Sequence, residues 1–487
     1  MKKLKSILLS AIILIVFPSI LESQAKPIAS VLKIEGFVFL DKNENGIFDP
    51  NEKPVEGVLI SNGANVVKSD RRGEFAIEKQ QEYLFPIIGE NYKISGSKSP
   101  ILNSANLVRI DNFSKKCLIA LSKRKTSKKR SVAMVGDMQA GDSLELDYAN
   151  RSVISELKSS KEIDLAIFLG DIINDDVKMM KPVKDAFVSI GRDVAIVAGN
   201  HDRDQFEENK LKTFNSEIGA ETFAFFRNKT LYVIINNVVS EGKHGYFGGY
   251  SESQLNFVKE LTETVSSKTE IVICQHIPFI HTKNRDLLAE ILYKYKPTPH
   301  FYSGHTHTVS NHRVNYKTTS FREIVSGASC GNWWQGEKGA DGVPEALMQC
   351  GSPRNYFLIT KKGGTLISRY KAVGRPNNFQ GTVTLSGSKF VANIFGASDS
   401  AQVRIKIGNG GWQTMKNENI IASEVATIIE NNKNGKYPTS GNTKNPLRKR
   451  ASSHIWTIES PYGNNYTQVI ILVKESAKNK ILFKSTF

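Results

Sequence analysis

Five short polar motifs, each directly after a run of apolar residues, could bring metal ligands together. They are Gly136-Asp137-Met138-Gln139, Gly170-Asp171-Ile172-Ile173-Asn174, Gly199-Asn200-His201-Asp202, Gln275-His276 and Gly304-His305-Thr306-His307. Short apolar runs followed by amphipathic segments predict parallel or mixed sheet strands with helices on the faces. Because open sheets of this kind bind ligands at the carboxyl ends of their strands, we expect these side chains to meet in one crevice. The sequence therefore predicts a metal site.

The number and the type of these side chains favour two metal ions. Six side chains are the main candidates, and Gln139 is a seventh: Asp137, Asp171, Asn200, His276, His305 and His307. A single tetrahedral zinc needs four ligands, and a hydrolytic zinc keeps one position open. Imidazole mixed with carboxylate and amide oxygen suits zinc, manganese or iron. Two such ions can clamp both oxygens of an in-line displacement, and Asp171 is the best placed bridge between them.

In this order, the five motifs resemble those of the calcineurin-like metallophosphoesterases, over about residues 131–315. The resemblance implies a four-layer α/β/β/α sandwich around a dinuclear centre. One metal would be held by Asp137, Gln139, Asp171 and His307, and the other by Asp171, Asn200, His276 and His305. His201 would not be a ligand but would protonate the leaving oxygen, with Asp202 or Asn174 orienting its ring.

Two positions narrow this resemblance. The family more often has His where Gln139 stands, and the neutral amide oxygen of Gln is a weaker ligand. We therefore expect the metal at Gln139 to bind loosely or to carry an extra water. The purple acid phosphatases have Tyr where Asn174 stands, so we do not expect a purple enzyme.

The predicted activity is hydrolysis of phosphate mono- or diesters by a hydroxide that bridges the two metals. The substrate would be a phosphorylated small molecule or a nucleotide-like compound. The alternative is a cell-surface binding module with a degenerate phosphoesterase site, which the basic charge, the calcium-type loop and the flanking β regions would suit. Completeness of the ligand set separates the two, and only Gln139 is unusual. A nuclease would need a basic groove beside the metals, and no clear nucleic-acid module is recognisable in the sequence.

The start of the chain predicts export. Residues 1–25 combine a basic start, an apolar run and small residues before a cut after Ala25, which is typical of a secretory signal peptide. We therefore expect a periplasmic or extracellular protein with no transmembrane span after cleavage. The formal net charge of the 487-residue chain is +17. Such an excess of positive charge favours anionic partners through long-range steering.

Residues 26–122 predict a small all-β domain that contains a calcium-type loop. Its oxygen ligands would come from Asp41, Asn43, Asn45, Ile47, Asp49 and Glu52, which match the spacing of calcium-binding loops. A strand and Pro54 flank the loop in place of two helices, so the domain is not an EF-hand. The loop and its strands resemble the prealbumin-like repeat domains of bacterial surface proteins. The alternative is a metal-free hairpin rich in Asx turns; a bound calcium would stiffen the loop.

Three further regions follow this domain. Residues 123–130 predict a basic linker, residues 131–320 the metallophosphoesterase domain and residues 321–487 a C-terminal β-sandwich. Within the middle region we expect helices over residues 142–158, 178–189, 205–218, 251–265 and 286–295. In the last region we expect a mobile loop over residues 431–450. Together the flanking regions resemble the modules that accompany one exported bacterial subgroup of the family.

Paired tryptophans and two cysteines add further candidates. Trp333 and Trp334 lie in a Gly-rich segment and could stack on a base or sugar of the substrate; the alternative is that both are core aromatics. Cys330 and Cys350 could form a disulfide, which export permits. Cys274, inside an apolar strand, is expected to be a buried free thiol.

Overall fold

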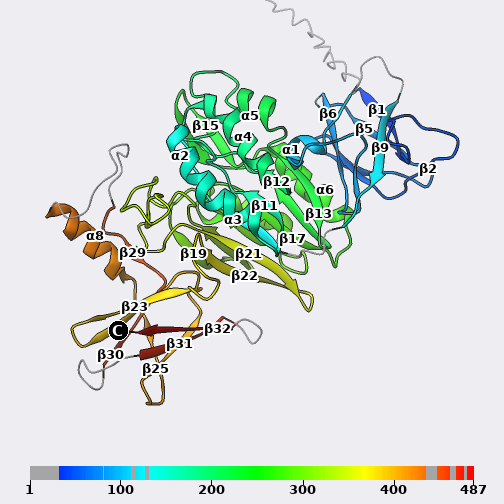
Figure 1. Cartoon of the computed structure of the whole chain (residues 1–487). Coiled ribbons are helices and arrows are strands. Elements are labelled where there is room, and N and C mark those ends of the chain that lie inside the picture. The colour runs from blue at the N-terminus through cyan, green and yellow to red at the C-terminus, as the bar shows by residue number, and fades with distance from the viewer. Residues whose placement is uncertain are drawn as a thin grey trace, which may run out of the picture. The chain divides into compact units, whose positions relative to one another are not determined.

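The computed structural model describes residues 32–80, 82–110, 116–126, 131–434, 447–460, 468–475 and 480–486 (Figure 1). Met1–Leu32 and Lys33–Phe487 form separate units, and the second unit contains all of the elements below. The expected signal peptide, residues 127–130 of the expected linker and residues 435–446 of the expected loop lie outside the described residues. Among the described helices, none has the length and apolar character needed to cross a membrane.

Two small sheets make up the first part of the described chain. One has the strand order β2-β1-β9-β7, with β5 paired to β1, and the other has the order β4-β3-β6-β8. The elements are β1 (Lys33–Leu40), β2 (Lys53–Pro54), β3 (Leu59–Ser61), β4 (Val66–Lys68), β5 (Glu74–Glu78), β6 (Tyr83–Ile87), β7 (Tyr92–Ile94), α1 (Leu102–Ala105), β8 (Val108–Arg109) and β9 (Cys117–Lys123). Ile34 and Val38 of β1 point into a core shared with Phe75 and Ile119. The predicted β character of this region is confirmed.

The calcium-type loop follows β1 and is closed by its own hydrogen bonds. The Asp41 carboxylate accepts the backbone N–H of Gly46 at 2.7 Å. The Asn43 amide donates to the Asp49 carboxylate at 2.9 Å. Calcium binding at this loop stays a prediction, because side-chain hydrogen bonds alone also stabilise such turns.

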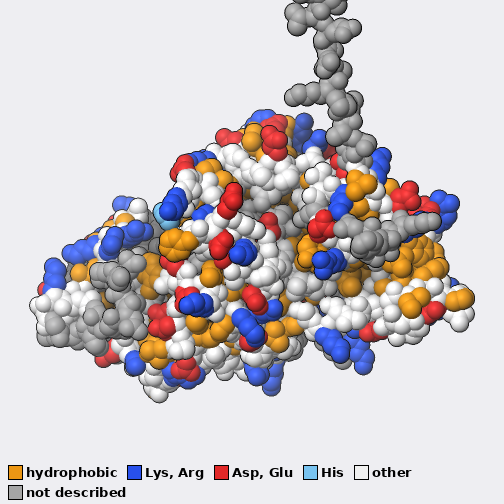
Figure 2. Space-filling model, turned by 90° about the horizontal axis from the view of Figure 1, so that it is seen from above, with side chains coloured by type: hydrophobic (Ala, Val, Ile, Leu, Met, Phe, Trp, Pro, Cys, Tyr) orange, Lys and Arg blue, Asp and Glu red, His pale blue; other side chains and the backbone are white. Residues whose placement is uncertain are grey.

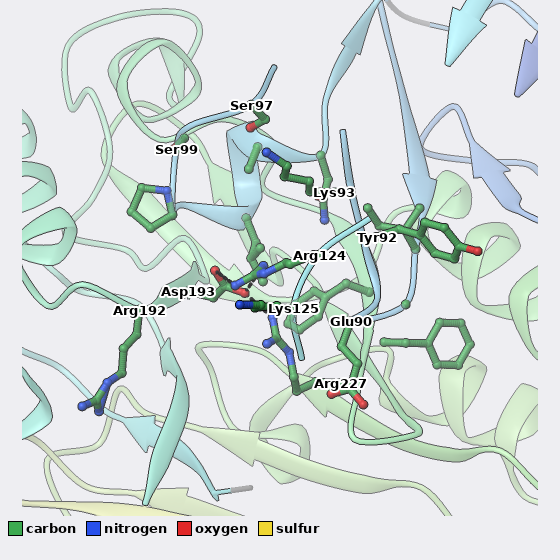
Figure 3. A pocket seen from close by; sticks show the side chains of 18 of the residues that line it. Glu90, Tyr92, Lys93, Ser97, Ser99, Arg124, Lys125, Arg192, Asp193 and Arg227 are labelled. Carbon is green, nitrogen blue, oxygen red and sulfur yellow. Dashed lines mark hydrogen bonds and ion pairs between the residues drawn. The ribbon is translucent and has the colours of Figure 1, made fainter. Parts of the chain in front are cut away.

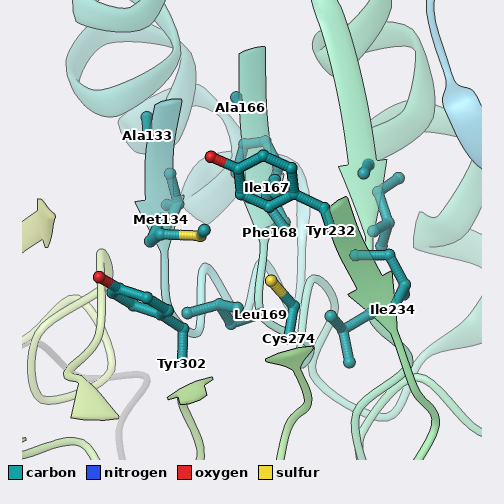
Figure 4. Packing of buried hydrophobic residues seen from close by; sticks show 14 of the residues in the cluster. Ala133, Met134, Ala166, Ile167, Phe168, Leu169, Tyr232, Ile234, Cys274 and Tyr302 are labelled. Carbon is teal, nitrogen blue, oxygen red and sulfur yellow. The ribbon is translucent and has the colours of Figure 1, made fainter. Parts of the chain in front are cut away.

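A sandwich of two sheets forms the central region. Its first sheet has the order β12-β11-β10-β21-β22 and its second the order β13-β14-β17-β18-β20-β19. The strands are β10 (Ser131–Val135), β11 (Ile163–Phe168), β12 (Asp193–Ile196), β13 (Phe223–Arg227), β14 (Thr230–Ile234), β17 (Glu270–Cys274), β18 (His300–Ser303), β19 (Val309–Tyr316), β20 (Thr319–Ser326), β21 (Asn355–Lys362) and β22 (Thr365–Ala372). Side chains from both sheets, such as Met134 and Ile167 from the first and Tyr232 and Tyr302 from the second, belong to one buried core (Figure 4).

Helices connect the parallel strands of both sheets. The elements are α2 (Ser143–Ala149), η1 (Asn150–Ile154), α3 (Ser155–Ser159), η2 (Val177–Met179), α4 (Met180–Ser189), α5 (Lys212–Glu217), α6 (Glu252–Thr264), η3 (Phe279–His281) and α7 (Arg285–Leu292), together with the hairpin β15 (Val238–Glu241) and β16 (Gly245–Gly248). The predicted capping box at Ser251 and Gln254 starts α6. This α/β sandwich with β regions on both sides confirms the predicted fold class.

One predicted helix is only partly present. Residues 205–218 were expected to be helical, but only α5 (Lys212–Glu217) forms. The Asp204 carboxylate accepts the backbone N–H and the hydroxyl of Thr213, at 2.8 and 2.7 Å. The backbone of Asp204 also bonds to Lys210 and Glu207, so the residues before α5 form turns instead of a helix.

The central sheets continue past residue 320. β20 pairs with β18, and β21 pairs with β10 of the first sheet, although β21 and β22 were expected in the C-terminal β-sandwich. Two other four-stranded sheets follow, with the orders β23-β24-β30-β27 and β26-β25-β31-β32. The elements are β23 (Gly381–Ser386), β24 (Lys389–Ile394), β25 (Gln402–Ile407), β26 (Trp412–Thr414), β27 (Lys416–Asn417), β28 (Ile420–Ile421), α8 (Ser423–Lys433), β29 (Ala451–Ser452), β30 (Ile455–Glu459), β31 (Gln468–Lys474) and β32 (Lys480–Thr486). The sequence analysis did not predict α8.

All four cysteines are free and buried, so Cys330 and Cys350 do not form the disulfide considered above. Cys274 is a buried thiol, as expected. Cys350 accepts the backbone N–H of Val309 at 3.4 Å, whereas Cys330 lies beside the predicted metal ligands.

A cavity of about 520 Å³ lies where the first β region meets the central sandwich (Figure 3). Several basic residues line it, and its arginines already have partners within the protein. Arg124 and Arg227 share the carboxylate of Asp193, and Arg227 also contacts Asp164 at 2.9 Å. Arg192 donates to backbone carbonyl oxygens. On the face seen in Figure 2, Lys and Arg are likewise interspersed with Asp and Glu.

His300, at the start of β18, should make the fold sensitive to acid. Burial and the charges of Arg322 and Arg313 lower the pKa of His300 to about 4. As the pH falls below 6.5, the unfolded chain therefore binds a proton that the folded chain excludes, and the free energy of unfolding decreases. Between pH 7 and pH 4, we expect the free energy of unfolding to decrease by about 2 kcal/mol less in His300→Gln than in the wild-type protein.

Urea unfolding of both proteins across this pH range, followed by tryptophan fluorescence, measures the effect. If the free energy of unfolding decreased equally with pH in the wild-type protein and in His300→Gln, the prediction about His300 would be contradicted. A second variant, His281→Gln, controls for the loss of a histidine at an exposed site.

Candidate metal centre

Each predicted ligand lies just after the carboxyl end of a strand. Asp137 follows β10, Asp171 follows β11, Asn200 follows β12, His276 follows β17 and His305 follows β18. β10, β11 and β12 are parallel neighbours in the first sheet, and β17 and β18 are parallel neighbours in the second. The polar motifs of both sheets therefore meet at one edge of the sandwich, as the sequence predicts.

His276 is the centre of one ligand group. Its Nε2 lies 3.1 Å from Oδ2 of Asp171, 3.0 Å from Oδ1 of Asn200 and 3.2 Å from Nδ1 of His305. Its Nδ1 contacts the carbonyl oxygen of Leu169 at 2.8 Å. Because a carbonyl only accepts, Nδ1 carries a proton, so Nε2, which faces the other three groups, is the nitrogen that would bind a cation. Ligand atoms of Asp171, His276 and His305 all lie within 4.8 Å of one another, which fits a shared cation.

A second ligand group contains Asp137 and His307. Nε2 of His307 lies 3.8 Å from Oδ1 of Asp137, and Nδ1 donates to the Gly331 carbonyl at 2.8 Å. The backbone N–H of His305 donates to both oxygens of Asp137, at 3.0 and 2.8 Å. This bond joins the Asp137 loop of the first sheet to the histidine loop of the second.

Gln139, the unusual ligand candidate, is buried beside a thiol. Its Oε1 lies 3.9 Å from Sγ of Cys330, and the same Sγ lies 3.9 Å from Nδ1 of His307. The backbone N–H of Gln139 donates to the carbonyl oxygen of Asp171 at 2.8 Å. The side chain therefore lies near the second group, while its role as a ligand stays a prediction.

Several site residues have backbone conformations that are uncommon outside glycine. Positive φ angles occur at Gln139 (39°), Asp171 (50°), His305 (72°), His307 (48°) and Trp333 (52°). Such conformations are sparsely populated and cluster at functional sites. Two glycines of the motifs also leave room for ligands, because a Cβ at Gly199 would lie 2.2 Å from Oδ1 of Asp171 and one at Gly304 would lie 2.4 Å from Oδ2 of Asp137.

The electrostatics of the site also fit cations. Burial lowers the pKa of His305 to about 3 and that of His307 to about 4, so both rings are neutral and can act as ligands. Burial alone would lower the pKa of His276 as well, but the negative charges of Asp171 and Asp137 raise it to about 9. The buried carboxylates therefore favour a positive charge beside them, and a bound metal ion would supply that charge.

His201 lies beside the ligand groups, and Asp175 orients its ring. Nδ1 of His201 is 2.9 Å from Oδ1 of Asp175, and Nε2 is 4.0 Å from Oδ2 of Asp171. Burial alone would lower the pKa of His201, but the hydrogen bond to Asp175 and the charge of Asp171 raise it to about 9. The ring is thus held in place with Nε2 facing the ligand groups.

The prediction that Asp202 or Asn174 orients His201 is wrong. The carboxylate of Asp202 accepts backbone N–H groups of Ile172, Ile173 and Gly199, at 2.8, 3.1 and 2.8 Å. Asp202 therefore fastens two ligand loops to each other instead of contacting the ring. For Asn174, the described residues contain no hydrogen bond between its amide and His201. The sequence analysis missed Asp175 because three consecutive side chains, at positions 174–176, could each have served.

The two tryptophans have different surroundings. Trp334 is 1% exposed and donates its indole N–H to the carbonyl oxygen of Met138, so it is a core residue and not a substrate platform. Trp333 stacks on the imidazole of His307, with ring centroids 4.2 Å apart and an angle of 19° between the planes. Only Trp333 thus remains a candidate for substrate contact.

Two family profiles match the chain. One, for the calcineurin-like phosphoesterases, covers residues 130–309, and the other, for the C-terminal region of calcineurin-like phosphoesterases, covers residues 323–479. With the sandwich and its ligand loops, these matches indicate a metal-dependent phosphoester hydrolase in general. The chain belongs to the calcineurin-like phosphoesterase family, as the motifs predicted.

Solved structures with a partly similar fold include two of low sequence identity. The purple acid phosphatase PPD1 isolated from seeds of yellow lupin (Lupinus luteus) is 11% identical, with 65% of this chain and 67% of that chain covered and a TM-score of 0.35. GAP50, the anchor in the inner membrane complex of Plasmodium, is 11% identical, with coverages of 50% and 84% and a TM-score of 0.34. No curated protein matches the chain.

Proposed function

We propose that the protein is an exported phosphoesterase that hydrolyses phosphate mono- or diesters at a dinuclear metal centre. The observation that supports this most is the cluster around His276, where carboxylate, amide and imidazole atoms lie 3.0–3.2 Å from one nitrogen. Asp171, Asn200, His276 and His305 would hold one ion, and Asp137, Gln139, Asp171 and His307 the other. Manganese, iron and zinc all suit this donor set.

Two bound ions would lower the pKa of a water molecule and neutralise the phosphoryl oxygens. The protein's own residues then have three tasks. Asp171 would belong to both ligand groups and keep them at a fixed separation. Asp202 ties the Asp171 loop to the loop that carries Asn200 and His201 through the backbone N–H groups of Ile172 and Ile173. Both tasks hold the reacting groups in place before the substrate arrives.

The third task is proton donation by His201. As the bond between phosphorus and the ester oxygen breaks, that oxygen takes the proton on Nε2 of His201. The hydrogen bond between Nδ1 and Asp175 keeps this nitrogen turned toward the site. The neutral ring then regains a proton from solvent, because the side chain is 28% exposed.

Hydrolysis assays with p-nitrophenyl phosphate and bis(p-nitrophenyl) phosphate test the proposal. We expect apoprotein to be inactive and activity to return with manganese, iron or zinc. A folded protein that stays inert toward both esters with every one of these metals would instead favour the binding-module alternative.

A further inference from the structure

A second cavity opens directly beside the candidate metal centre. Its volume is about 330 Å³, and its lining consists of His305, Thr306, His307, Trp333, Gln349, Arg448 and Arg450. The first three residues belong to the ligand loop after β18. Both arginines come from a segment more than 130 residues later in the chain, just before β29. One wall of the cavity therefore carries candidate metal ligands and another carries two guanidinium groups.

Hydrogen bonds connect the arginine segment to the metal centre. The backbone N–H of Arg448 donates to Oε1 of Gln349 at 2.6 Å, and the amide of Gln349 donates to Oδ1 of Asn332 at 3.1 Å. Asn332 directly precedes Trp333, whose ring is stacked on the candidate ligand His307. The backbone at Arg448 is thus joined by hydrogen bonds to the loop that carries Trp333.

Arg448 and Arg450 carry charges that no described carboxylate neutralises. Both side chains are exposed, and the described residues include no carboxylate within ion-pair distance of either guanidinium. By contrast, Arg124 and Arg227 at the larger cavity are both paired with Asp193. Free guanidinium groups at the edge of a pocket are well suited to bind a phosphate group through two parallel hydrogen bonds.

We propose that the substrate carries a second phosphate group, which Arg448 and Arg450 bind while the reacting phosphate lies at the metal centre. This inference rests on the proposed function. Two guanidinium charges match the two negative charges of a phosphate monoester better than the single charge of a carboxylate. Trp333 also lines this cavity, so its ring would pack against the part of the substrate that links its phosphates.

A matched pair of substrates tests the inference. The probes are 4-hydroxybutyl phosphate and 1,4-butanediol bisphosphate, which differ by one phosphate, with release of inorganic phosphate as the readout. We expect the metal-loaded wild-type protein to favour the bisphosphate in kcat/KM, mainly through KM. Replacing both arginines, R448Q with R450Q, should reduce this preference by about tenfold or more, as expected for lost charge-assisted hydrogen bonds.

Lys449→Gln is the control, because Lys449 is an exposed cation between the two arginines that does not line the cavity. It should leave the preference for the bisphosphate unchanged. A wild-type protein without a preference would overturn the inference, as would an equal effect of Lys449→Gln. So would a stronger preference for 4-phosphooxybutanoate, in which a carboxylate replaces the second phosphate.

Calorimetric titration with 1,4-butanediol bisphosphate separates this inference from the proposed function. If no phosphate ester is hydrolysed with any metal, the proposed function fails. Binding of the bisphosphate that weakens in the double arginine variant but not in Lys449→Gln would still support the anion site. Binding that is the same in all three proteins would overturn it.

Discussion

Asp171→Asn should lower the hydrolysis of p-nitrophenyl phosphate by about a thousandfold, which corresponds to about 4 kcal/mol of transition-state stabilisation. One oxygen of the Asp171 carboxylate lies 3.1 Å from Nε2 of His276, and the other accepts the backbone N–H of His201 at 2.8 Å. An amide has one ligand oxygen and no charge, so it cannot bridge two cations. We therefore expect the variant to lose bound metal together with activity.

Steady-state kinetics combined with elemental analysis of the purified variant measure both effects. Asp176→Asn is a matched control, because Asp176 is an exposed residue of the same loop that caps the next helical turn. It should keep the activity and the metal content of the wild-type protein. Asp171→Asn protein that folds, binds two metal ions and hydrolyses the ester normally would show that Asp171 is not the bridge.

His201→Ala should slow the hydrolysis of alkyl phosphates far more than that of aryl phosphates. An alkoxide is a poor leaving group that needs a proton, whereas p-nitrophenolate leaves without one. General acid catalysis contributes about a hundredfold to ten-thousandfold. We expect a loss near the middle of this range for glycerol 1-phosphate, and a loss of about tenfold or less for p-nitrophenyl phosphate.

Asp175→Asn tests the role of Asp175, which orients the ring of His201, with the same two esters. Without the charged partner of Nδ1, the ring of His201 is held less firmly, so the loss should again be larger for the alkyl ester but smaller than in His201→Ala. Unchanged metal content would separate this effect from damage to the ligand groups. Equal losses for both esters in His201→Ala would rule out proton donation.

Much of the site could be predicted because its residues occupy strand ends. Chain order alone places Asp137, Asp171 and Asn200 after three consecutive strands, and the apolar runs before them are continuous. Parallel pairing of these strands then fixes the edge at which the side chains meet. The motif order also indicated the family, which the profile matches confirm.

The residues that were missed depend on contacts between distant or ambiguous positions. Asp175 follows Asn174 in a run of turn residues, and the turn geometry alone decides which side chain reaches His201. Arg448 and Arg450 line the cavity beside the site, and Gln349 binds the backbone N–H of Arg448 there. Trp334 could not be separated from Trp333 by sequence, because the burial of one ring depends on how the loop at residues 327–335 folds back on Met138.

Anomalous X-ray scattering from crystals grown with manganese tests the central claim most directly. The predicted result is two peaks about 3.5–4 Å apart with the Asp171 carboxylate between them. His276 and His305 should lie next to one peak, and Asp137 and His307 next to the other. A single peak, or peaks that Asp171 does not touch, would contradict the dinuclear centre.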